Sequence, residues 1–268
     1  MKTSSRLALI FLVLFAGAAV FAARLAPVGP GDVSDVVRTR FLPPGTVDDF
    51  GVLHLLGTDR LGRDVWSRLL FGARISLAVA ALATVVAAVV GIAVGATAAL
   101  VRPATGVLLG LTDFSLAVPR VVLLLLLASL WQPGARLAVL TLGLTGWMPI
   151  ARLAYAETRG QLGRAYVDGA RALGGSRFRL FRRHVLPNVA PSLLAAATLG
   201  LGSAVSLEAG LSFLGLGVQP PAASWGTMIA SGRDTVVNAP WVGLVPGIAL
   251  VLVVLSATLV ADGLERNR

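Results

Sequence analysis

Residues 166–187 read YVDGARALGGSRFRLFRRHVLP, and they form the longest strongly cationic segment in a chain that is otherwise mostly apolar. Good helix formers run from Ala165 to Leu173, and the pair Gly174-Gly175 interrupts them. Ser176 can then cap a second helix, which Pro187 is expected to end. The segment therefore predicts two short helices joined at a glycine break, and the rest of the chain is interpreted as holding them in place.

Two long apolar runs flank this segment, and its arginines greatly outnumber its acidic residues. The positive-inside rule therefore places it on the cytoplasmic side of a membrane. A signal for membrane topology requires only the positive charge of the arginines and no particular helix pattern. The small residues Gly169, Ala170 and Ala172, together with the glycine break, indicate a shaped contact surface as well.

The amino-acid composition limits the classes of protein to which the chain can belong. The 268 residues are 56% hydrophobic and only 13% charged, which leaves too little polar surface for a soluble domain of this size. With no cysteine and two histidines, the sequence predicts no disulfide and no metal site. Lys2 is the only lysine, so the chain has no P-loop, and we expect no catalytic residue in it. The net charge of +10 is assigned to membrane topology, and no nucleic-acid partner is expected.

We predict an all-α membrane protein with six transmembrane helices and both termini in the cytoplasm. Residues 1–24 hold the first helix, 25–74 an external segment, and 75–268 a five-helix core with a cytoplasmic loop at 157–187. The stretch 24–74 is assigned outside because its seven arginines nearly balance six aspartates. The expected spans are Leu7–Ala23, Ile75–Leu100, Val107–Trp131, Leu137–Ala156, Val189–Leu214 and Trp241–Ala261.

The first apolar run has two interpretations. It is either a retained helix or a signal peptide that is cleaved after Ala22. The run is long for a signal sequence and just long enough to span a bilayer, so a retained helix is favoured.

Features inside the spans indicate where helices pack and where function lies. Gly91 and Gly95 form a G-x-x-x-G pair that would let another helix approach closely. Glu208 is an ionisable group deep in the fifth span, so it either serves function or fixes packing through a hydrogen bond to a neighbouring helix. The glycines and prolines between Ser212 and Pro240 predict a loop or re-entrant segment at the outer face.

The basic segment resembles the EAA loop in the membrane subunits of ATP-binding-cassette (ABC) importers. That pattern is Glu-Ala-Ala, three residues, Gly, nine residues and Ile-x-Leu-Pro. This chain has Asp168-Gly169-Ala170, then Gly174, then His184-Val185-Leu186-Pro187, and it departs at Asp168, Gly169 and His184. Two more blocks, GTDRLGRDVWSRLLFGARISLAVA at 57–80 and the stretch 208–226, are similar to C-type permeases of dipeptide, oligopeptide and nickel importers.

The resemblance implies the type I ABC importer permease fold in the bacterial inner (cytoplasmic) membrane. It implies a second permease subunit, two ABC ATPase subunits, an external substrate-binding protein and the lipid bilayer as partners, with ATP and Mg bound by the ATPases and no cofactor in this chain. The implied solutes are di- or oligopeptides, with nickel or another small solute as the alternative. The implied ATPase-coupling residues are Asp168, Gly169, Ala170, Arg171, Leu173, Gly174 and Arg177. The substrate path is expected near Glu208, Ser212 and Phe213.

Two other classes compete with this interpretation. A secondary transporter or channel would need no ATPase, but it favours inverted repeats, and the first half has no counterpart of residues 208–226. A membrane scaffold would use the basic loop to bind anionic lipid or ribosomal RNA. Retention of an ATPase in mild detergent separates the importer from both.

Overall fold

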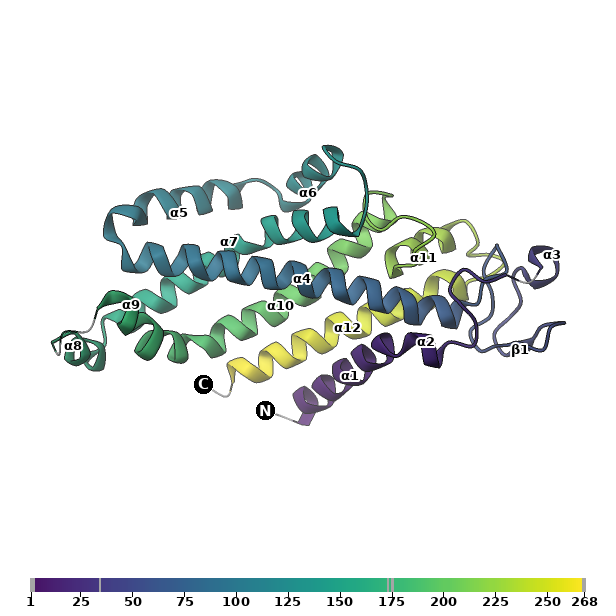
Figure 1. Cartoon of the computed structure of the whole chain (residues 1–268), viewed down its shortest axis with the longest axis horizontal. Helices are drawn as coiled ribbons and strands as arrows, with labels where there is room; N and C mark the ends of the chain where they lie inside the picture. The colour runs from purple at the N-terminus through teal and green to yellow at the C-terminus, as the bar shows by residue number, and fades with distance from the viewer. Residues whose placement is uncertain (1–2, 34, 173, 175, 267–268) are drawn as a thin grey trace.

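The computed structural model describes residues 3–33, 35–172, 174 and 176–266 as an elongated bundle of long helices (Figure 1). Its long helices are mainly apolar, as expected of membrane spans, which satisfy their backbone polar groups internally and face lipid with their side chains. Five of them are long and apolar enough to cross a bilayer. They are α1 (Thr3–Val20), α4 (Val65–Leu100), α7 (Ala135–Leu162), α10 (Leu186–Phe213) and α12 (Trp241–Glu265).

The sixth candidate span is broken. Helices α5 (Arg102–Ala117) and α6 (Arg120–Ser129) pass the same test only as a pair, and they are bent by 87° at the break. The break falls at Pro119, which lacks the N–H that would continue the helix and disfavours helical geometry at Val118. Counted as one span, the pair brings the total to the six that were predicted.

Helices α4 and α7 make the most extensive contact in the bundle. Gly91 and Gly95 lie at this contact, and a β-carbon on Gly91 would come within 2.6 Å of the backbone oxygen of Trp147. A β-carbon on Gly95 would lie 2.8 Å from that of Ala154. The predicted close approach at the G-x-x-x-G pair is therefore confirmed, with α7 as the approaching helix.

The segment between α1 and α4 folds against one end of the bundle, opposite to the end that carries the basic segment (Figure 1). It contains two short helices and a two-stranded antiparallel hairpin. These elements are α2 (Ala22–Leu25), α3 (Val36–Thr39), β1 (Thr46–Val47) and β2 (Leu53–His54).

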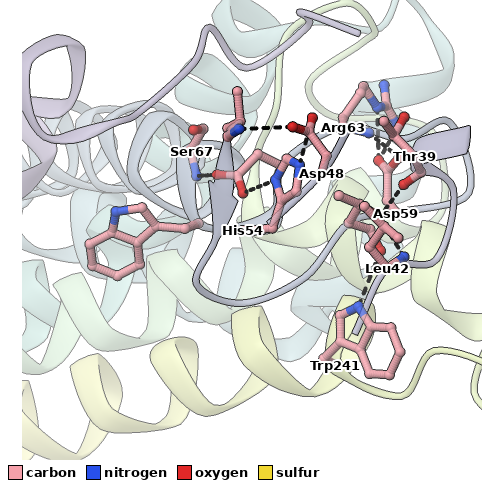
Figure 2. A network of polar contacts seen from close by, with 12 residues as sticks. Thr39, Leu42, Asp48, His54, Asp59, Arg63, Ser67 and Trp241 are labelled. Atoms are coloured by element: carbon pink, nitrogen blue, oxygen red, sulfur yellow. Dashed lines mark hydrogen bonds and ion pairs between the residues drawn. The ribbon is translucent and has the colours of Figure 1, made fainter. Parts of the chain in front are cut away.

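A buried histidine fastens this hairpin to the start of α4 (Figure 2). Nδ1 of His54 lies 2.9 Å from Asp64, and Nε2 lies 3.4 Å from Asp48. Asp64 also accepts a hydrogen bond from the amide of Ser67 at 2.7 Å, so it caps the helix. The helix consequently begins at Val65, and the boundary expected between residues 74 and 75 falls inside α4.

A second set of hydrogen bonds ties the segment to α12 (Figure 2). The hydroxyl of Thr58 donates to the backbone oxygen of Thr39 and accepts from the amide of Leu42. The indole of Trp241 donates to the backbone oxygen of Thr58 at 3.1 Å. Residues that lie far apart in the sequence are thereby joined at the first turn of α12.

We predict an acid-sensitive contribution to stability from Asp48. Burial alone would raise its pKa, but the amides of Val52 and Phe50 and the side chain of His54 bring the pKa below the ordinary value of 3.8. A depressed carboxyl pKa stabilises the fold above the ordinary value, and this stabilisation is lost as pH falls through the folded-state pKa. In detergent, the Tm of wild type should therefore exceed that of Asp48→Asn at pH 7, with the gap closing below about pH 4. A gap that stays constant from pH 7 to pH 3 would contradict this assignment.

Helix α1 packs against α12 and α4. Phe15 lies 5.6 Å from the ring of Trp225, and Ala22, just beyond α1, is fully buried. The first turn of α1 and the last turn of α12 lie toward the end of the bundle that carries the basic segment (Figure 1). The retention of residues 1–22 and the cytoplasmic side of the termini stay predictions.

Candidate functional site

The basic segment folds as two short helices, as predicted. Helix α8 (Ala165–Ala172) is followed by α9 (Arg177–Leu180), and the oxygen of the Ser176 side chain accepts a hydrogen bond from the amide of Arg179 at 3.4 Å. We call residues 165–180 the basic bend.

The expected end of the second helix at Pro187 is wrong. A five-residue π-helix, η1 (Phe181–Val185), continues α9 directly into α10. Pro187 lies in the first turn of α10, where a helix tolerates a residue without an N–H, and the π-turn absorbs the change in hydrogen bonding. The basic bend is therefore joined without interruption to the fifth span.

Apolar contacts anchor the basic bend to the bundle. Val167 of α8 is fully buried in a cluster with Ala154 of α7 and Val189 of α10. The hydroxyl of Tyr166 donates to the side chain of Gln161 at 2.8 Å, and the guanidinium of Arg177 donates to the backbone oxygen of Leu100 at 3.0 Å. The bend therefore contacts α4, α7 and α10 together.

The outer surface of the basic bend carries most of the predicted coupling residues. Ala170 is half-buried, whereas the other members that the structure describes are exposed: Asp168, Gly169, Arg171, Gly174 and Arg177. Leu173 lies outside the described residues. Asp168 and Arg171 form an ion pair at 2.9 Å, and both side chains are more than half exposed. Such a pair contributes little to stability in water, so both charges are available to another protein.

Gly174 sets the turn of the bend. Its φ is +82°, in the left-handed region that residues with a β-carbon rarely adopt. No heavy atom lies within 4 Å of the position that a β-carbon would occupy. The glycine is therefore needed for backbone conformation and not for close packing inside this chain.

Glu208 lies in the packed interior, in the C-terminal half of α10. It is fully buried, and one carboxylate oxygen accepts a hydrogen bond from Ser212 at 2.7 Å. The hydroxyl of Ser212 also accepts from the amide of Val218 at 3.0 Å, in the turn that follows α10. Ser76 of α4 and Ser224 lie beside the carboxylate. Glu208 therefore belongs to a polar cluster between α4, α10 and the following segment, and its hydrogen bond with Ser212 lies within its own helix.

That following segment contains a nine-residue helix and no membrane-spanning helix among its described residues. Helix α11 (Trp225–Arg233) begins at a capping box formed by Ser224 and Thr227. Its Trp225 is buried, and the indole donates to the backbone oxygen of Leu69 in α4 at 3.2 Å. A β-carbon on Gly226 would lie 2.7 Å from that of Ser212, so α11 packs tightly over the Glu208 cluster.

Only Phe213 of the three predicted path residues lies on the open side of α10. Glu208 and Ser212 are buried, whereas Phe213 is 38% exposed. With 3.6 residues per turn, Phe213 shares its side of the helix with a row of exposed residues. This row is Leu199, Ser203, Ser206, Gly210 and Phe213.

Arg120 is a functional candidate that the sequence prediction missed. It is the first residue of α6, directly after the break at Pro119 between α5 and α6. It lines a groove of about 380 Å³ between α4, α6, α7 and α10. The sequence signal for it was a charge beside Pro119 at the start of an apolar run. A charge beside a helix-breaking proline predicts that the first turns of this span lie at the cytoplasmic surface and that Val121 to Trp131 is its dry part, and it indicates no solute site.

The fold and the site define a multi-pass, mainly helical membrane protein with an exposed two-helix bend between its fourth and fifth spans. The model of the family described as "binding-protein-dependent transport system inner membrane component" matches residues 87–268, and the chain belongs to this family. It is thus a transport permease subunit.

Relatives named as peptide permeases align with almost the whole chain. The chain is 38% identical over 259 residues to the di/tripeptide transport system permease protein DppC of Pseudomonas aeruginosa (strain UCBPP-PA14), which covers 96% of this chain and 84% of DppC. It is 37% identical over 265 residues to a Brucella suis biovar 1 protein provisionally named a peptide transport system permease. This alignment covers 98% of this chain and 86% of the Brucella protein.

A solved structure confirms the predicted fold. A chain from the inward-facing MetNI methionine ABC transporter superposes with a TM-score of 0.63, covering 75% of this chain and 95% of that one. The identity is 21%, so this likeness concerns the fold alone, that of an ABC importer permease.

Proposed function

We propose that this chain is one of two membrane permease subunits of an ABC importer for di- or oligopeptides. The alignment with DppC over 96% of the chain carries the proposal. The relatives reported above are named for peptides, which favours peptides over nickel or another small solute.

In this proposal the basic bend couples the chain to the ATPases. Closure of two cytoplasmic ATPase subunits, which bind the ATP and Mg, displaces α8 as a small rigid body. The Val167 cluster passes this displacement to α7 and α10, and Arg177 passes it to the end of α4. The solute path then opens between this chain and the second permease.

Each predicted coupling residue has a role in that contact. Gly169 and Ala170 allow close approach of the ATPase surface, Gly174 sets the turn, and Leu173 supplies an apolar side chain. Arg171 and Arg177 pair with acidic groups of the ATPase, and Asp168 orients Arg171 through their ion pair.

The remaining partners are assigned by position. The segment 25–64 and α11 lie at the end opposite to the basic bend and would receive the external binding protein. The exposed row on α10 would face the second permease. This arrangement has both termini on the cytoplasmic side of the bacterial inner membrane.

Co-purification and uptake test the proposal. An affinity-tagged chain, extracted from its native membrane in mild detergent, should retain an ABC ATPase and a second permease. Reconstituted with the binding protein, the complex should take up a labelled dipeptide only when ATP is present. Substituting Arg171 and Arg177 by glutamate should release the ATPase. The control Arg136→Glu, in the first turn of α7 and far from the basic bend, should retain it. A wild-type complex that holds no ATPase would refute the coupling assignment.

A further inference from the structure

The groove beside Arg120 contains a positive charge that forms no ion pair with any acidic side chain in the described part of the chain. The Nε of Arg120 lies 3.4 Å from the hydroxyl of Thr145, and Nη2 lies 3.4 Å from the backbone oxygen of Leu142. A charged side chain inside a membrane bundle usually faces a partner or a solute path, because leaving it unpaired there is costly.

The groove has the size and polarity of a small-molecule site. Its volume is about 380 Å³, within the range of about 300–1,000 Å³ that is typical of ligand pockets. Its walls are mostly small or apolar, with Arg120, Thr84 and Ser203 as polar members, and Glu265 from the end of α12 also lines it. A second hollow of about 390 Å³ adjoins it, sharing Arg120 and Ser203 and adding Ser206.

An unused hydroxyl supports a ligand in this groove. Thr84 Oγ1 is buried and has no hydrogen-bond partner among the described residues. Gly146 leaves space beside the guanidinium of Arg120, because a β-carbon at Gly146 would lie 3.2 Å from Nη2 of Arg120. The groove is therefore lined by a planar cation and by a threonine whose buried hydroxyl has no partner among the described residues.

The broken span adds to this electrostatic character. The break between α5 and α6 lies well inside the bundle along its long axis, away from both ends (Figure 1). In secondary transporters, discontinuous helices near the bilayer midplane direct their positive N-terminal ends toward anionic groups of the substrate. Arg120 stands at the N-terminal end of α6, so its charge and the helix dipole have the same sign.

We propose that this groove binds the carboxylate of the transported solute, with Arg120 as the anion-binding residue and Thr84 as a hydrogen-bond donor. The guanidinium presents two parallel N–H groups that match a carboxylate, and such charge-assisted pairs are strong in a dry site. This inference rests on the proposed function, and it names the C-terminal carboxylate of a peptide as the group that is recognised.

Uptake of paired substrates tests the proposal. A dipeptide with a free C-terminus and its C-terminal amide are compared in proteoliposomes that contain the complete importer. Arg120→Gln should lower uptake of the free acid by about tenfold or more relative to wild type and leave uptake of the amide nearly unchanged. Arg120→Lys should retain part of the free-acid uptake, and Arg136→Gln should change neither. An equal loss for both peptides would overturn the proposal.

Thiol labelling gives a second readout that does not require transport. The chain has no cysteine, so Ser203→Cys provides its only thiol. This thiol should react faster with an anionic methanethiosulfonate reagent than with a cationic one, and Arg120→Gln should remove the preference. Ser129→Cys, at the far end of α6, serves as the control and should not respond to Arg120→Gln.

The two readouts separate the two claims. If the wild-type importer takes up neither peptide, the proposed function fails. If the thiol of the Ser203→Cys variant keeps the same preference for the anionic reagent after Arg120→Gln is added, the anion site itself is refuted.

Discussion

Replacing Gly95 by leucine should prevent the chain from reaching its folded state. A β-carbon at this position would already lie 2.8 Å from both the β-carbon of Ala154 and the amide nitrogen of Tyr155, and it would come closer still to the backbone oxygen of Ala151. Backbone atoms cannot move aside as a flexible side chain does, so α7 would have to separate from α4. Because these helices form the largest contact in the bundle, we expect little monodisperse protein after extraction.

A graded series tests this expectation. Gly95→Ala should lower stability by about 1–3 kcal/mol, which is the usual cost of overpacking, and should be measurable as a lower Tm in detergent. Gly110→Ala and Gly110→Leu are matched controls, because no heavy atom lies within 4 Å of a β-carbon at Gly110. A Gly95→Leu protein with wild-type yield and Tm would show that the α4–α7 contact is looser than described.

The same glycines illustrate how far the sequence determines the fold. The spacing of Gly91 and Gly95 predicted which side of the span would be approached, since residues four apart share one side of a helix. It could not predict that α7 is the partner, because any apolar helix with small residues would satisfy that pattern. The six spans were predictable for a similar reason, since bilayer thickness fixes the length of an apolar run.

Prolines were predictive only in part. At Pro119 the span expected over Val107–Trp131 is broken and bends by 87°. At Pro187 the expected helix end is absent, because a π-turn precedes the proline and the helix continues. Sequence marks where a helix loses one hydrogen bond, whereas neighbouring packing decides whether the helix ends there.

The polar residues inside the bundle show the limit of prediction most clearly. The sequence singles out Glu208 as an ionisable residue within an apolar span, but its position in the packed interior depends on Ser212 and on the turn around Val218. His54 joins two aspartates, one of them ten residues away in the chain, through a hairpin that no pattern in the sequence predicted. Contacts of this kind depend on tertiary placement and not on local periodicity.

Replacing Gly174 by valine should abolish peptide uptake while leaving the chain inserted and folded. The native φ of +82° costs a residue with a β-carbon about 1–2 kcal/mol, and a β-branched side chain tolerates it least. The cost is local, because open space surrounds the position and the Val167 cluster still anchors α8. The bend should therefore turn differently and, under the proposed coupling, present Asp168 and Arg171 to the ATPase at the wrong angle.

The control for this variant separates backbone conformation from side-chain bulk. Asparagine adopts the left-handed region more readily than other residues with a β-carbon, so Gly174→Asn should keep a substantial part of the uptake that Gly174→Val loses. Membrane insertion, Tm in detergent, ATP hydrolysis and ATP-dependent uptake are measured for both variants. Valine should reduce uptake at least tenfold with little change in Tm, since the strain lies in an exposed turn that supports no core contact. Wild-type uptake in Gly174→Val would mean that force from the ATPase does not pass through this turn, and the coupling role would then have to be sought elsewhere on the chain.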